Sequence, residues 1–146
     1  MKNWRSQSLW GAAIAVGLMV APAANAQQPK ATTVTGPVVD VACFMIHPSA
    51  AEAPSHKECA AACVARGVPV AIANEADGQL YFPADQKQLQ SYRDTRVTAA
   101  GTFVRKDEPL QLKMPVGDKN EMEVKVTGGY NVLTIDKVVA APKAAR

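Results

Sequence analysis

The chain has 146 residues, with 16 Lys and Arg against 13 Asp and Glu, and a formal net charge of +3. This length suits one domain with one hydrophobic core. The small net charge and the aromatic content of 5% argue against a surface that binds nucleic acid or anionic lipid.

The first 26 residues have the three-part pattern of a cleaved secretory signal peptide. A short basic start, Met1 to Arg5, precedes an uncharged apolar run from Leu9 to Val20, and Ala24 and Ala26 supply small residues for cleavage. A helix of that run would be about 18 Å long, against about 30 Å of membrane hydrocarbon. We therefore predict a periplasmic or secreted protein, cleaved near Ala26, with no membrane anchor after cleavage.

Cleavage would change the charge of the working protein. Loss of Lys2 and Arg5 reduces Lys and Arg from 16 to 14 against 13 Asp and Glu, so the net charge becomes 14 − 13 = +1. Residues 27–140 are predicted to form a single small β-barrel domain, and residues 141–146 a flexible tail. A near-neutral exported domain of this kind is not expected to have a nucleic-acid partner.

The first predicted strand runs from Thr32 to Phe44. Its residues are mostly β-branched or apolar, and Gly36 and Pro37 interrupt them. Proline cannot donate a hydrogen bond to a neighbouring strand, so this pair predicts a kink or bulge.

The clearest helix signal extends from Ser55 to about Arg66. Ser55 and Glu58 have the spacing of a capping box, in which each side chain caps a backbone N–H of the other residue. Gly67 follows in the position that often needs a left-handed backbone at the end of a helix.

The rest of the chain is predicted to form short strands and one further helix. In chain order these are a strand over 69–73, a hairpin turn at Asp77-Gly78, a strand over 79–82, a short helix over 84–92, a strand over 95–105, and a closing hairpin with strands over 121–127 and 130–139.

This order predicts a mainly β fold with one or two helices, in the α+β class. Short strands punctuated by Gly and Pro favour a small, partly open OB-like β-barrel. The helix over 84–92 would occupy the place that an OB-type barrel gives to its helix, between the third and fourth strands. The helix at about 55–66 would then be an insertion between the first two strands.

Three Cys and two His lie between Cys43 and Cys63. On the predicted helix, Cys59 and Cys63 are four residues apart and His56 is three before Cys59, so the three share one face. In an extended strand end, Cys43, Met45 and His47 would alternate onto one face as well.

One interpretation of this cluster is a structural disulfide, which an oxidising compartment would preserve. Cys43 would pair with Cys59 or Cys63, and a loop of that size is worth about 3 kcal/mol of stability. A second interpretation is a transition-metal site for copper or zinc, because thiolate, imidazole and thioether groups suit these ions. The candidate metal ligands are Cys43, His56, Cys59 and Cys63, with His47 and Met45 as alternates.

A third interpretation is thiol-redox chemistry. The Cys-x3-Cys spacing in a β-rich context differs from the Cys-x2-Cys of thioredoxin-type sites, and Val64 stands where a haem-attachment motif needs His. The sequence has no evident catalytic triad, phosphate loop or paired-carboxylate motif. The function that the sequence favours is therefore that of a non-enzymatic exported domain that binds metal or is held by a disulfide. The alternative is a periplasmic thiol-redox or metal-delivery factor that acts on a partner protein.

A longer pattern includes this cluster. It consists of a strand with Cys43, a His-x2-Cys-Ala-x2-Cys helix, a Gly-x-Pro segment and an Asp-Gly hairpin that ends in Tyr, at His56, Cys59, Ala60, Cys63, Gly67, Pro69, Asp77, Gly78 and Tyr81. The pattern resembles small exported bacterial domains that have no assigned activity. The resemblance implies an OB-like barrel and a Cys/His site, and it covers roughly residues 36–139.

Overall fold

The structure is a computed structural model that describes residues 27–46, 56–116 and 119–142. The predicted signal peptide, His47, Ser55 and residues 143–146 of the predicted tail lie outside these ranges. Within the described ranges, no helix has the length and apolar composition needed to cross a membrane.

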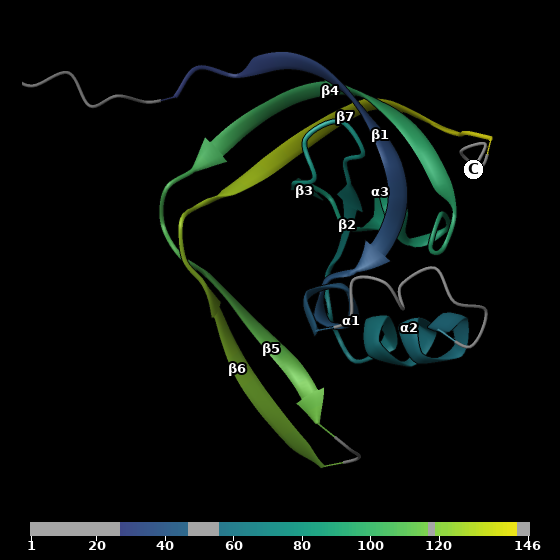
Figure 1. The fold of residues 1–146 in the computed structure, drawn as a ribbon, viewed down its shortest axis with the longest axis vertical. Helices are drawn as coiled ribbons and strands as arrows, with labels where there is room; N and C mark the ends of the chain where they lie inside the picture. The colour runs from purple at the N-terminus through teal and green to yellow at the C-terminus, as the bar shows by residue number, and fades with distance from the viewer. Residues whose placement is uncertain (1–26, 47–55, 117–118, 143–146) are drawn as a thin grey trace, which may run out of the picture.

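Five strands close into a barrel, in the order β1-β2-β3-β7-β4, and β4 returns to pair with β1 (Figure 1). The five strands are β1 (Lys30–Asp40), β2 (Val70–Ala73), β3 (Leu80–Pro83), β4 (Arg96–Lys106) and β7 (Tyr130–Ala140). The β3–β7 pair is parallel and the other pairs are antiparallel. Helix α3 (Lys87–Gln90) lies between β3 and β4 in the chain, as an OB-type barrel requires. The predicted OB-like α+β fold is confirmed, although the barrel is closed rather than partly open.

The main core fills the inside of the barrel. Its buried residues alternate along the strands, and Leu89 of α3 joins them with no exposed surface. They are Val34, Val38, Val70, Ile72, Tyr81, Leu89, Val97, Ala99, Leu133 and Ile135. The barrel therefore has a packed interior, and any ligand site must lie at an end or on an outer face.

The predicted first strand is too long. Strand β1 ends at Asp40, and residues predicted to continue it form the short helix α1 (Val41–Ile46) instead. The reason is a helix cap: the Asp40 carboxylate Oδ1 accepts the backbone N–H of Cys43 at 2.9 Å. Asp is a favoured residue at the cap position, and this bond stabilises the first turn.

The helix predicted at about 55–66 is confirmed as α2 (His56–Ala65). Its end is a Schellman motif, in which the N–H of Val68 donates to the carbonyl of Cys63 and the N–H of Gly67 to that of Val64, both at 3.0 Å. Gly67 has the φ of +91° that this motif needs, as the sequence predicted. The motif fixes the backbone of Cys63 relative to the chain that follows.

A second sheet forms an arm beside the barrel (Figure 1). It consists of β5 (Leu110–Val116) and β6 (Asn120–Val126), inserted between β4 and β7. The predicted closing hairpin is therefore wrong, because β6 pairs with β5 and β7 pairs with β4 and β3. The partner strand β5 was not predicted, since prolines at 109 and 115 mask its short alternation of Leu110, Leu112 and Met114.

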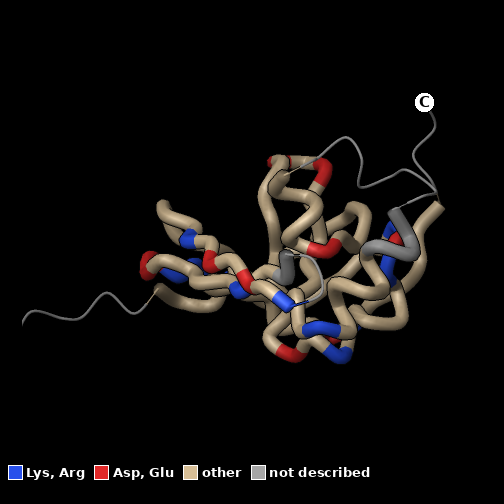
Figure 2. The backbone as a smooth tube through the Cα atoms, turned by 90° about the horizontal axis from the view of Figure 1, so that it is seen from below, with Lys and Arg blue, Asp and Glu red and all other residues tan. Residues whose placement is uncertain are grey.

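One face of the arm packs on the outside of the barrel. Leu112 of the arm is buried together with Val41, Ala71 and Phe82, which belong to α1, β2 and β3. The other face carries charges of both signs, because Lys113, Glu121, Glu123 and Lys125 alternate with the apolar residues of β5 and β6. Figure 2 shows residues of both signs along the arm. Lys113 stands opposite Glu123 in the β5–β6 ladder, a cross-strand pairing that favours this register.

An ion pair joins the β2–β3 turn to the start of β4. Arg96 donates from Nε and Nη2 to the two carboxylate oxygens of Glu75 at 2.8 and 2.7 Å. The hydrogen bond from Arg96 lowers the pKa of Glu75 below its ordinary value of 4.5 by more than desolvation raises it, and the positive charge adds to the lowering.

We predict that Glu75→Gln lowers stability slightly at pH 7 and that the difference disappears in acid. A carboxyl whose pKa is lower in the folded state stabilises the fold above its unfolded pKa, and that contribution is lost as the pH falls through the folded pKa. Urea unfolding of both proteins at pH 7 and pH 3 measures this. An equal difference at both pH values would contradict it.

Candidate metal centre

Helices α1 and α2 both lie in the connection between β1 and β2, at one end of the barrel (Figure 1). The antiparallel register pairs Asp40, the last residue of β1, with Val70, the first residue of β2. The N–H of Val41 also donates to the carbonyl of Pro69 at 3.1 Å. The start of α1 and the chain leaving α2 are therefore held side by side.

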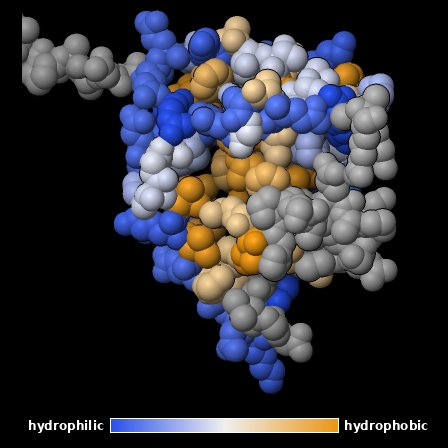
Figure 3. All heavy atoms as spheres, in the orientation of Figure 1, coloured by the Kyte–Doolittle hydropathy of each residue, from blue (hydrophilic) through white to orange (hydrophobic). Residues whose placement is uncertain are grey.

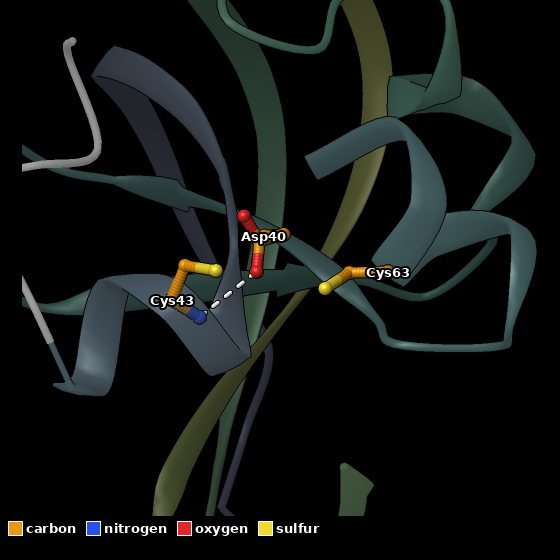
Figure 4. Close-up of side chains that lie close together, drawn as sticks. All are labelled: Asp40, Cys43 and Cys63. Atoms are coloured by element: carbon orange, nitrogen blue, oxygen red, sulfur yellow. Dashed lines mark hydrogen bonds between the residues drawn. The ribbon is translucent and has the colours of Figure 1, made fainter. Parts of the chain in front are cut away.

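This connection brings together Asp40, Cys43 and Cys63. One carboxylate oxygen and the two Sγ atoms all lie within 4.8 Å of one another. Figure 4 shows both thiols directed toward the Asp40 carboxylate, one from α1 and the other from α2. Three elements thus contribute one potential ligand atom each to a common point.

Asp40 is buried, with 2% of its surface exposed. Its Oδ1 is the acceptor of the Cys43 N–H, which orients the carboxylate. Its Oδ2 is buried as well. Removing a carboxylate from water costs free energy unless hydrogen bonds or a cation compensate the loss of hydration. A cation bound between this carboxylate and the two thiols would therefore be stabilised.

Cys43 and Cys63 are half-buried, and they are not joined to each other by a disulfide. The side chain of Cys63 packs against a small apolar cluster of Ala42, Val68 and Met114. Met114 belongs to β5, so the arm contributes to the apolar surroundings of the thiol. Such surroundings limit the access of water and strengthen electrostatic interactions at the site.

Of the sequence-predicted ligands, the structure places Cys43 and Cys63 together. Met45 is 39% exposed and does not belong to the group of three. Its expected alignment with Cys43 on a strand face is wrong, because positions two apart on a helix are separated by about 200°. His47 and the side chains of His56 and Cys59 lie outside the described residues.

The sequence pattern of Cys, His and Met residues did not identify Asp40 as a ligand. A signal for it exists in the sequence. Asp40 stands three residues before Cys43, the spacing at which a helix-capping Asp binds the third backbone N–H of the helix. Recognising this cap would have predicted the end of β1 and the third member of the cluster together.

Two sulfurs and a carboxylate oxygen form a donor set that zinc accepts in proteins. The same two sulfurs lie within 4.8 Å of each other and are not bonded to each other. No protein-family model, curated protein or solved structure matches the chain. The resemblance to exported domains with a Cys/His site stays a prediction.

We predict different effects for two substitutions of Asp40. Asp40→Asn keeps an oxygen that can accept the Cys43 N–H, whereas Asp40→Ala removes the cap and should cost about 1 kcal/mol more in unfolding free energy. Urea unfolding of the metal-free, reduced variants measures the difference. Equal stability of the two variants would show that the cap does not hold α1.

Proposed function

We propose that this protein is an exported, non-enzymatic domain that binds a transition metal ion through Asp40, Cys43 and Cys63. The observation that carries the proposal is the convergence of three ligand atoms, from β1, α1 and α2, within 4.8 Å of one another. The export part rests on the signal-peptide pattern of residues 1–26.

The separations suit a metal after a small adjustment. Tetrahedral zinc with Zn–S bonds of about 2.3 Å needs its sulfurs roughly 3.8 Å apart. The donor atoms lie within 4.8 Å, so shifts of about 1 Å or less would bring them to bonding positions. Side-chain rotation of Cys43 and Cys63 can supply most of this movement, because Asp40 is already oriented by its bond to α1.

The donor set favours Zn²⁺ over Cu⁺. Thiolates suit both ions, but a carboxylate suits zinc and adds little to the binding of a soft ion such as Cu⁺. Two thiolates and one carboxylate carry three negative charges, which a divalent cation largely compensates. Cys59 and His56, which α2 carries in the same connection, are the sequence-predicted candidates for a fourth ligand.

A second candidate function uses the same thiols without a metal. Cys43 and Cys63 could form a disulfide by exchange with a disulfide of a partner protein. The two thiols would lose their protons and two electrons, and the partner disulfide would be reduced to two thiols. The closeness of the two sulfurs favours this candidate, and an oxidising compartment would promote it.

We predict that the reduced mature chain binds one Zn²⁺ and that Cys43→Ser or Cys63→Ser weakens binding by more than about 100-fold. Loss of supporting residues around a metal costs about 10–100-fold, so loss of a ligand should cost more. Asp40→Asn should cost at least about 10-fold for zinc and leave Cu⁺ binding unchanged. Competition with a chromophoric chelator measures each affinity.

Two matched controls accompany this titration. Met45→Leu changes an exposed sulfur on α1 without touching the cluster, and Glu75→Gln neutralises a carboxylate that binds Arg96 instead. Both should bind zinc like the parent chain. Zinc binding by Cys63→Ser at parental affinity would overturn the proposed site.

We also predict that zinc and a Cys43–Cys63 disulfide exclude each other. Oxidised glutathione should convert the metal-free chain to a species that lacks two hydrogens, with both cysteines in one cross-linked peptide after proteolysis. Bound zinc should slow this reaction strongly, because the thiolates are coordinated. Oxidation at the same rate with and without zinc would separate the two functions and contradict a shared site.

A further inference from the structure

A hollow lies between the barrel and the base of the arm, and none of its lining residues belongs to the cysteine cluster. Its volume is about 270 Å³, and its apolar wall consists of Leu80, Phe82, Val126 and Tyr130. Figure 3 shows apolar side chains gathered on the face between barrel and arm, with hydrophilic ones along the outer edge. This volume is just below the range of about 300–1,000 Å³ that is typical of ligand pockets, so the hollow has room only for a small molecule.

One end of the hollow is polar and carries a positive charge. The guanidinium of Arg105 donates from Nη1 to Asn131 Oδ1 at 3.3 Å and to Gln79 Oε1 at 3.5 Å, and from Nη2 to the carbonyl of Gly128. Asn131 is buried and donates from Nδ2 to Gln79 Oε1 at 3.0 Å. Neutral oxygens on three different segments thus fix the orientation of the cation.

Arg105 differs from the other arginine of the same strand. Arg96 forms a two-bond ion pair with Glu75, whereas no carboxylate among the described residues pairs with Arg105. A half-buried cation that is held in place but not neutralised attracts an anion more strongly than a solvated one. Its remaining N–H groups suit the fork geometry of a carboxylate.

The turn between β6 and β7 is shaped for this arrangement. Gly129 has a φ of +81°, and a Cβ there would lie 2.4 Å from the carbonyl oxygen of Lys106 and 3.2 Å from Nη2 of Arg105. A side chain at this position would displace both the turn and the guanidinium. Glycine at position 129 leaves room for the guanidinium beside the turn, where the carbonyl of Gly128 accepts its hydrogen bond.

The apolar wall includes an aromatic pair. The rings of Phe82 and Tyr130 meet edge to face, with centroids 5.8 Å apart at 81°. We propose that this hollow is a second binding site, which takes a small carboxylate with a flat apolar body. Arg105 would bind the carboxylate, and the aromatic and aliphatic wall would cover the body. The site is separate from the metal proposal, because it shares no residue with the cysteine cluster.

We predict that the mature chain binds benzoate and that Arg105→Gln weakens this binding about 10–100-fold, the effect of one charge-assisted contact. Two-dimensional NMR titration measures the affinity and shows which amides shift. The expected shifts are at Gln79, Tyr130 and Asn131. The matched control Arg96→Gln removes the paired arginine of the same strand and should bind benzoate like the parent chain.

Further titrations test each feature of the site. Benzyl alcohol, which lacks the charge, and inorganic phosphate, which lacks the apolar body, should both bind more weakly than benzoate. Val126→Phe fills the hollow from the arm without changing Arg105, and should abolish binding even if Arg105→Gln fails to fold. Absence of benzoate binding at millimolar concentration, or equal binding by Val126→Phe, would overturn the proposal. Unchanged binding of benzoate by Cys63→Ser would confirm that the two sites are independent.

Discussion

The pairing of β1 with β2 decides where the candidate metal centre forms. Barrel closure brings the end of β1 opposite the start of β2, so residues 41–69 must leave and return at nearly the same point. The chain fills this excursion with α1 and α2, and backbone bonds fix both at that point. Asp40 at the departure and Cys63 shortly before the return are consequently neighbours, although 23 positions separate them in the sequence (63 − 40).

Asp40 has two structural roles that reinforce each other. As the cap of α1 it ends the strand and turns Cys43 toward the barrel end, and the same bond holds its own carboxylate beside both thiols. A cap alone needs no burial, since Ser, Asn or an exposed Asp would serve. Burial places this carboxylate beside both thiols, where the proposed metal ion would offset part of its desolvation.

The sequence predicted most of the barrel because its signals are local. Gly67 after α2 and Asp77-Gly78 before β3 need particular backbone conformations, and the alternation in β4 and β7 is long enough to identify them. The predictions that failed depended on a choice between two local signals for the same residues, or on a choice between two possible pairing strands. Residues 41–44 have strand propensity, but the Asp40 cap makes them helical. The pairing of β6 depends on β5, and β5 is difficult to recognise in the sequence because it is short and has prolines at 109 and 115. Two of the three members of the cluster, Cys43 and Cys63, could be predicted from residue type, but Asp40 required the cap to be recognised.

The arm is the element that an OB-type barrel does not need, and it contributes to both proposed sites. Through Met114 it packs near Cys63, and through Val126 it lines the hollow that contains Arg105. The apolar contacts of Leu112 with the outside of the barrel hold the arm between these two places. The arm therefore has an apolar contact next to each proposed site, with Met114 beside Cys63 and Val126 in the wall of the Arg105 hollow. In the proposed sites these contacts would limit the access of water to Cys63 and give the hollow part of its apolar lining.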